Sequence, residues 1–66
     1  MNGTIELFNE KSGFGFIKPD EEEKDIMFYG KNFKTQNISI FEGQRVEFDV
    51  IDGPKGKEAI NIVVIK

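Results

Sequence analysis

The chain has 66 residues, no cysteine and no histidine, and its nine basic and twelve acidic side chains give a net charge of −3. This length predicts a single domain, residues 1–66, near the lower size limit for folding without disulfides or metals. The composition excludes a disulfide framework, thiolate metal sites, most zinc sites and every Ser-His or Cys-His catalytic arrangement. We see no signal peptide and no apolar run of the roughly 20 residues that span a bilayer. We therefore expect a cytoplasmic protein without a cofactor or a bound metal.

Turn signals separate five short segments with strand character, at residues 3–9, 13–18, 26–29, 45–50 and 58–66. Pro19 lacks a backbone N–H and ends the second segment, and the Asp-Gly-Pro-Lys-Gly-Lys turn at 52–57 precedes the fifth. This spacing predicts an all-β fold, a five-stranded closed or partly closed barrel. The expected inward-facing residues are Ile5 or Leu7, Ile17, Ile26, Phe28, Ile40, Val46, Phe48, Val50, Ile60, Ile62 and Val64.

Two connections carry possible functions of their own. Residues 20–25 contain five acids and one lysine, which we interpret as a solvated hairpin loop whose charges discourage edge-to-edge pairing. A calcium site is the alternative, but the Asp-x-Asp-x-Asp-Gly spacing and the distal glutamate of an EF-hand loop are missing. Residues 30–39 form a longer irregular segment, and a loop of this length is often functional.

The second segment, around Ser-Gly-Phe-Gly-Phe-Ile at residues 12–17, alternates glycine with phenylalanine at the period of a strand. Phe14 and Phe16 therefore project from one face, and Gly13, Gly15 and Ile17 belong to the other. Glycine inside a strand weakens it and usually marks a close approach of the backbone, a bend or a bulge. The pattern predicts a thin-backed strand that exposes two aromatic rings.

The third segment completes this surface. If Ile26 and Phe28 face the core, Met27 and Tyr29 face outward beside the two phenylalanines, whereas the opposite phase would bury a tyrosine hydroxyl that then needs a partner. We call Phe14, Phe16, Met27 and Tyr29 the stacking platform. Leu7 or Phe8 of the first segment would extend it. A base stacked on an aromatic ring gains about 1–3 kcal/mol with little dependence on sequence.

Lysines around the platform are the candidate phosphate contacts: Lys11, Lys18, Lys31, Lys34, Lys55 and Lys57. The net charge of −3 opposes binding of a polyanion, so the acids have to be segregated from the lysines or stacking has to supply most of the affinity. The alternative for the rings is burial in the core or against another subunit. The two interleaved glycines and the neighbouring Met-x-Tyr favour an exposed platform.

The same residues resemble the cold-shock domain family. Residues 12–17 are similar to its first ribonucleoprotein motif, Lys-Gly-Phe-Gly-Phe-Ile, and residues 7–9 (Leu-Phe-Asn) resemble the preceding Trp-Phe-Asn. Residues 25–29 (Asp-Ile-Met-Phe-Tyr) stand where the second motif, Asp-Val-Phe-Val-His, belongs. Residues 42–48, and later Gly56 with Asn61-Ile62, resemble the fourth and fifth strands. The resemblance covers essentially the whole chain. It implies a five-stranded antiparallel OB-type Greek-key barrel that binds single-stranded RNA and DNA and acts as an RNA chaperone tuning transcription or translation.

The departures from the family fall on the binding face. They are Leu7 for the stacking tryptophan, Glu6 and Ser12 for lysines, Met27 for phenylalanine, Tyr29 for histidine, Gly30 for an aromatic residue, Asn37 for the loop aromatic that caps the platform, and Lys57 for glutamine or proline. Phe33 or Phe41 could substitute for the capping aromatic. These changes predict a weakened or shortened site centred on Phe14, Phe16 and Tyr29. The resemblance implies single-stranded, pyrimidine-rich RNA and DNA as partners of a monomer or weak dimer, with no membrane or small-molecule substrate.

Two other functions remain as alternatives. A divergent barrel could use the altered face for a protein partner, and the acidic balance and the adaptable apolar residues Leu7 and Met27 favour that hypothesis. An enzyme has almost no support, because the chain has no histidine, no cysteine and no paired carboxylates on opposing elements. We therefore expect no catalytic residues.

Overall fold

The computed structural model describes residues 1–35 and 38–65. Its strands are β1 (Asn2–Asn9), β2 (Phe14–Pro19), β3 (Ile26–Tyr29), β4 (Arg45–Gly53) and β5 (Gly56–Val64), and a short 3₁₀ helix, η1 (Gly30–Asn32), follows β3. The strands close into a barrel in the order β1-β2-β3-β5-β4. The predicted five-stranded, all-β OB-type barrel is confirmed.

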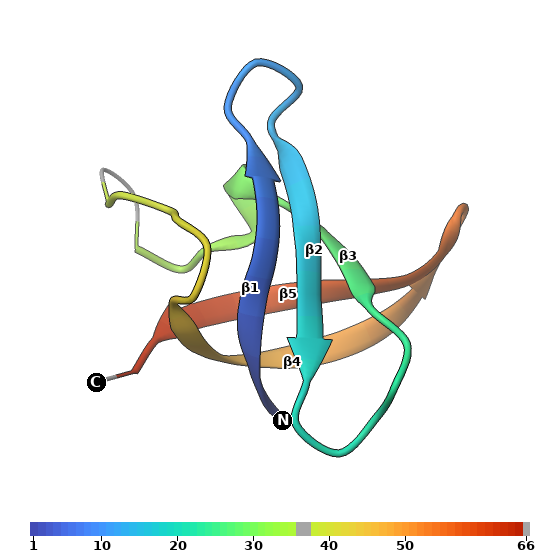
Figure 1. The fold of residues 1–66 in the computed structure, drawn as a ribbon. Helices are drawn as coiled ribbons and strands as arrows, with labels where there is room; N and C mark the ends of the chain where they lie inside the picture. Colours follow the sequence, from blue (N-terminus) through green and yellow to red (C-terminus); the bar gives the residue numbers. More distant parts are fainter. Residues whose placement is uncertain (36–37, 66) are drawn as a thin grey trace.

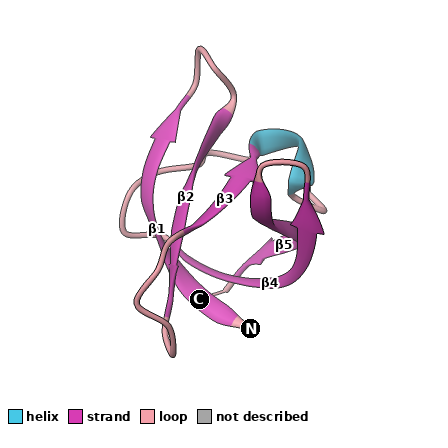
Figure 2. Cartoon of the chain, turned by 90° about the vertical axis from the view of Figure 1, so that its right-hand side faces the viewer, coloured by secondary structure: helices cyan, strands magenta, loops and turns pink. Residues whose placement is uncertain are grey.

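Figure 1 shows how the barrel is layered: β1, β2 and β3 stand side by side, and the β4–β5 hairpin crosses behind them. Neighbouring strands pair antiparallel, except β3 and β5, which pair in parallel through Met27–Glu58 and Phe28–Ala59. The same crossing is visible from the side in Figure 2. Because β4 also pairs with β1, the β1–β3 sheet has no open edge and its outer face is its one solvent-exposed face.

The regular strands bury the residues that their alternation predicts. In β2 and β3 buried and half-buried residues alternate without interruption, so Ile17, Ile26 and Phe28 enter the core. The buried cluster consists of Ile5, Ile17, Ile26, Phe28, Phe33, Val46, Phe48, Ala59 and Ile62, and Phe8, Ile38, Ile40 and Val50 pack against it partly buried. Most of the predicted core is therefore confirmed, and the exceptions lie where a strand is irregular or ends.

An irregularity in β1 decides between the two predicted core residues of that strand. The register between β1 and β2 shifts between Ile5 and Leu7, and such a bulge reverses the side to which later residues point. Ile5 is therefore buried, whereas Leu7 is 48% exposed. Phe8 turns toward the core, and its ring stacks on Phe28 with 5.7 Å between centroids and an interplanar angle of 14°.

A second irregularity, in β5, makes one core prediction wrong, and the end of the strand leaves another residue exposed. The register between β4 and β5 shifts at Asn61, which has a φ of 52°, a conformation that asparagine tolerates better than most residues. The buried residues Ala59 and Ile62 are consequently three positions apart rather than two. Ile60, predicted to face inward, is half-buried and pairs with the outward-facing Asp49. Val64, also predicted to face inward, pairs with buried Val46 but is 37% exposed because it is the last residue of β5.

The irregular segment after β3 contributes to the core and seals the barrel. Phe33 is buried, lies edge-to-face on Phe28 at 5.8 Å, and bridges Ile62 in parallel. Asn32 Nδ2 donates to Glu58 Oε2 at 2.9 Å and to the Ala59 carbonyl at 2.8 Å. Phe33 therefore cannot serve as the surface aromatic that caps the platform, and Asn37 lies outside the described residues.

The acidic connection between β2 and β3 is anchored by the barrel. Arg45 donates two 2.6 Å hydrogen bonds to the Asp20 carboxylate and a third, of 2.9 Å, to Thr4 Oγ1. The hydrogen bond from Arg45 holds the pKa of Asp20 below its ordinary value. Lys18 Nζ donates to the carbonyls of Pro19, at 3.1 Å, and Glu22. These contacts support the interpretation of the acidic segment as a structural connection between β2 and β3.

The described part of the chain lacks two features that other functions would need. Across residues 1–35 and 38–65, no group of three or more acidic, histidine or cysteine side chains is arranged to hold a metal ion, which leaves the calcium alternative for the acidic loop without a site. No described helix is long and apolar enough to cross a membrane.

Candidate nucleic-acid interface

The glycine behind the platform allows β1 and β2 to approach closely. A Cβ atom on Gly15 would lie 2.0 Å from the carbonyl oxygen of Leu7, so no side chain fits there. The expected close approach of the backbone is confirmed. Gly13, at a φ of 77°, ends the tight β1–β2 turn, in which Asn9 Oδ1 accepts from the backbone N–H of Lys11 at 2.9 Å. Glycine is favoured at such a φ because it has no Cβ.

The outer face of the β1–β3 sheet carries two parallel rows of side chains. Phe16 is paired with Leu7 on one side and with Met27 on the other, and we call these three residues the apolar row. Phe14 is paired with Tyr29, and we call these two the aromatic row. Since all four platform residues are half-buried, they are held in place by neighbours and still present surface to solvent. The predicted phase of β2 and β3 is confirmed.

The rings of the platform are stepped rather than flat. Phe14 meets Phe16 at 6.1 Å between centroids with an angle of 79°, and meets Tyr29 at 6.5 Å with an angle of 62°. Both contacts are edge-to-face arrangements, which aromatic rings favour. The three rings therefore support one another, and each offers a separate surface to a ligand.

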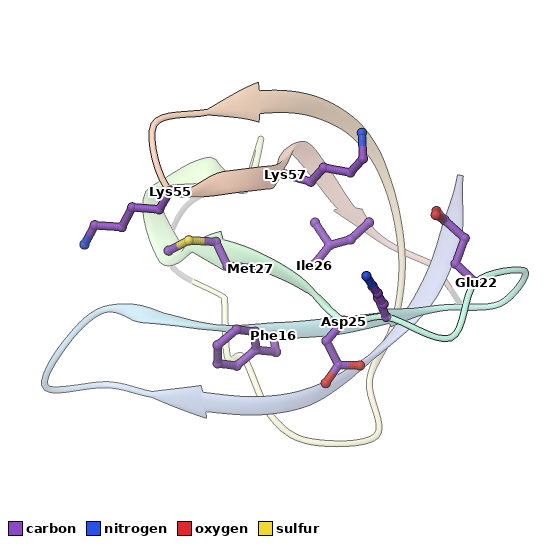
Figure 3. Close-up of a pocket in the computed structure, with 8 residues that line it drawn as sticks. Phe16, Glu22, Asp25, Ile26, Met27, Lys55 and Lys57 are labelled. Atoms are coloured by element: carbon purple, nitrogen blue, oxygen red, sulfur yellow. The ribbon is translucent and has the colours of Figure 1, made fainter.

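A hollow of about 400 Å³ adjoins the apolar row. Figure 3 shows it between three parts of the chain: β2 and β3, the loop before β3, and the β4–β5 turn. Its lining residues are Phe16, Glu22, Lys24, Asp25, Ile26, Met27, Lys55 and Lys57. Its volume is within the range of small-molecule pockets, and the apolar residues lie beside both carboxylates and ammonium groups. Glu22, Lys24 and Asp25 were not predicted as site residues; the only sequence signal was Asp25 at the start of the second motif.

The predicted lysines surround the platform unequally. Lys31 Nζ lies 5.3 Å from the centroid of the Tyr29 ring, a cation–π distance, so it adjoins the aromatic row. Lys55 and Lys57 line the hollow, and Lys57 pairs with Asp52 at 3.3 Å. Lys11 is exposed in the β1–β2 turn. Lys34 is also exposed, and its backbone N–H donates to the Ile62 carbonyl oxygen at 2.9 Å. Lys18 uses two of its donors on the carbonyls of Pro19 and Glu22.

The acids are partly segregated from these lysines. Glu47 and Asp49 are exposed on the outer side of β4, away from the β1–β3 face. Glu58 on β5, in contrast, pairs with Met27 of the apolar row. Asp20 is paired with Arg45. Glu6, Glu22 and Asp25 remain exposed around the platform, so the segregation is incomplete.

The β1 side of the platform depends on Leu7 rather than on Phe8. Leu7 lies in the apolar row beside Phe16, whereas the Phe8 ring packs on Phe28 beneath the sheet. Phe41, one of the two residues considered as a capping aromatic, is 55% exposed. It precedes Gly43, whose N–H donates to the Ile5 carbonyl at 2.8 Å, so this segment runs alongside β1 (Figure 1).

A closed barrel in the order β1-β2-β3-β5-β4 with aromatic side chains across the outer face of β2 and β3 defines an OB-type barrel, a class that binds oligonucleotides on that face. The comparison with known proteins identifies the family. The sequence profile of the 'Cold-shock' DNA-binding domain matches residues 1–65, and the chain belongs to that family.

Individual relatives agree over nearly the full length. The chain is 38% identical over 66 residues to cold shock-like protein CspE of Escherichia coli K12, covering 98% of this chain and 96% of the relative. It is 41% identical over 70 residues to cold shock-like protein CspC of the same strain, with the same coverage. Among solved structures, Drosophila Unr CSD456 superposes with a TM-score of 0.85 at 29% identity, over 98% of this chain and 26% of that one.

Proposed function

We propose that this protein binds single-stranded RNA and DNA by stacking bases on the platform, and acts as an RNA chaperone or regulator of transcription or translation. The observation that carries the proposal is the pair of rows on one solvent-exposed face, with Phe14 and Tyr29 in one and Phe16 and Met27 in the other. Membership of a family described as a DNA-binding domain supports it.

The spacing of the rows favours single strands. Phe14 and Phe16 are two residues apart on β2, which is roughly 6.8 Å along a strand. Stacked bases in a B-form strand rise roughly 3.4 Å per nucleotide, so neighbouring bases can each occupy one row only if they are unstacked from each other. A duplex cannot do this without opening. Binding to the rows therefore competes with base pairing, which is how an RNA chaperone melts weak secondary structure.

The affinity follows from the number of contacts. One base on each row gains about 2–6 kcal/mol from stacking, and the lysines at positions 11, 31, 55 and 57 are the candidate phosphate contacts. If all four contribute, the slope of log Kd against log salt concentration reaches about 3, since each phosphate on a single strand contributes roughly 0.7. We expect a Kd in the micromolar range or weaker, with a salt slope no steeper than about 3.

The test is titration of fluorescently labelled heptathymidine and hexauridine at two salt concentrations. Phe14→Ala and Phe16→Ala should each weaken binding roughly 5- to 150-fold, the equivalent of about 1–3 kcal/mol. Ile51→Ala is the matched control, because Ile51 is an exposed apolar residue on the outer side of β4. Unchanged affinity in both phenylalanine variants would contradict stacking on the platform. An oligoadenylate of equal length tests the expected preference for pyrimidines.

The chaperone activity is tested separately with a weak RNA hairpin carrying a fluorophore and a quencher. Wild-type protein should open the hairpin, and Phe14→Ala should open it less at equal concentration. An unopened hairpin at saturating protein would limit the function to single-strand binding. A cytoplasmic location belongs to the same proposal, because single-stranded RNA is its ligand.

A protein partner on the same face is the second candidate, favoured by the exposure of the apolar side chains Leu7 and Phe41. The two candidates differ in the response of the backbone amides of Phe14, Phe16 and Tyr29 to a short pyrimidine oligonucleotide. Shifted amide resonances support the nucleic-acid site, and no shift at millimolar oligonucleotide supports the protein partner. We expect a monomer or weak dimer, which sedimentation of the free protein measures.

A further inference from the structure

Met27 occupies a position in the platform that a redox reaction can alter. It is half-buried in the apolar row, between Phe16 on β2 and Glu58 on β5. It also lines the hollow of about 400 Å³. Figure 3 shows its thioether beside the Phe16 ring at one side of that hollow. A small oxidant that enters the hollow therefore reaches the sulfur where a base would stack.

The sequence leaves few other sulfur atoms to react. The chain has two methionines and no cysteine, so no thiol competes for the oxidant. Met1, the second methionine, lies at the start of β1, where its amine donates to the Phe48 carbonyl at 3.1 Å. Met1 contributes nothing to either row of the platform. Met27 is thus the one sulfur whose chemistry can change the proposed binding face.

We propose that Met27 is an oxidation site at which hydrogen peroxide converts the thioether to the sulfoxide and weakens single-strand binding. This inference rests on the proposed function. The sulfur lone pair attacks a peroxide oxygen, and the S–O bond forms as the O–O bond breaks. The transferred oxygen gives its proton to the departing hydroxide, which leaves as water. The sulfur is oxidised by two electrons and the peroxide is reduced by two. Methionine sulfoxide reductases, one for each epimer, reverse the step.

The oxidised side chain is a poor stacking partner. A sulfoxide is polar and chiral where the thioether is flexible and apolar, so a base that covers it has to displace water from the new oxygen. Oxidation removes the contact between the methionine sulfur and the aromatic base. The loss of a sulfur–aromatic contact makes the Kd about 2- to 12-fold weaker. Phe14 and Tyr29 contain no sulfur and keep the aromatic row intact. Oxidation therefore weakens the site without abolishing it.

The experiment treats the folded protein with hydrogen peroxide, removes the peroxide, and maps sulfoxide formation on each methionine by peptide mass spectrometry. The Kd for labelled hexauridine is then measured before treatment, after treatment, and after both reductases. We expect a sulfoxide at Met27, a Kd about 2- to 12-fold weaker, and recovery after reduction. The thermal midpoint of the oxidised protein reports whether the barrel is still folded.

Met27→Leu is the matched variant, because leucine keeps an apolar side chain of similar volume and leaves Met1 as the only sulfur. The Kd of this variant after peroxide is compared with its own untreated value, and we expect no change. An equal loss of affinity in Met27→Leu would overturn the inference, as would a Met27 that resists oxidation while Met1 reacts. Full conversion of Met27 with an unchanged Kd overturns it and leaves the proposed function standing. An untreated protein that binds no oligonucleotide overturns both.

Discussion

Leu7 is the position at which a single substitution should strengthen the proposed site most. It lies in the apolar row directly beside Phe16 and is 48% exposed. The cold-shock family, which this chain resembles at residues 7–9, usually has a stacking tryptophan there. Because the bulge in β1 turns Leu7 away from the core, Leu7→Trp adds an indole to the solvent side of the sheet without displacing a core side chain.

The size of the effect follows from one added stack. A base on an aromatic ring gains about 1–3 kcal/mol, so Leu7→Trp should bind hexauridine roughly 5- to 150-fold more tightly than wild type. Surface substitutions of this kind change the free energy of unfolding by no more than about 0.5 kcal/mol. Affinity and stability should thus change independently.

The assay uses the new indole as its probe, since wild type contains no tryptophan. Titration with unlabelled hexauridine should quench the fluorescence of Leu7→Trp as a base stacks on the ring. Ile51→Trp is the control, because it adds the same fluorophore at a 44% exposed position on the outer side of β4. It should show neither quenching nor tighter binding in competition with labelled oligonucleotide. A folded Leu7→Trp that binds no more tightly than wild type would refute the assignment of the apolar row as a stacking surface.

Three further substitutions test the parts that position the site. Gly15→Ala places a Cβ 2.0 Å from the Leu7 carbonyl oxygen, and urea unfolding should show a loss of about 3 kcal/mol or more; a loss below 0.5 kcal/mol would mean that the strands separate easily. Asp20→Asn removes a carboxylate whose pKa Arg45 lowers from 3.8. In wild type its stabilisation is present above the unfolded pKa and is lost as pH falls through the folded value. The urea midpoint of the variant should therefore fall less between pH 7 and pH 3, and an equal fall would contradict the sign. Glu6→Lys should steepen the slope of log Kd against log salt by about 0.7, and an unchanged slope would show that no phosphate passes there.

The sequence predicts the platform well because β2 and β3 are regular. Their side chains alternate without a bulge, so the positions of Phe14 and Phe16 follow from the period of a strand alone. The phase of β3 follows from Tyr29, because a buried tyrosine hydroxyl would need a hydrogen-bond partner. The pairing of β2 with β3 follows from the short connection between the two strands.

The irregular strands could not be predicted in the same way. An extra residue at Asn61 reverses the faces of β5 after Ile60, and alternation alone contains no information about where such a residue lies. Asparagine in the otherwise apolar stretch at residues 59–65 is the signal in hindsight, because it tolerates a positive φ. Phe33 was missed for another reason. It enters the core through the closure of β3 on β5, a long-range contact that no local pattern reports.

The close approach of β1 and β2 at Gly15 determines which side chains lie on the outer face, where the chain departs from the family. Because a side chain at Gly15 would collide with β1, the two strands are fixed at a short distance, and the adjacent bulge sends Phe8 inward to Phe28 and Leu7 outward to Phe16. The departures at positions 7 and 27 therefore fall on side chains that face solvent more than they support the core. We expect substitution there to change affinity with little effect on folding, so that the barrel keeps its buried residues while the chemistry of its outer face diverges.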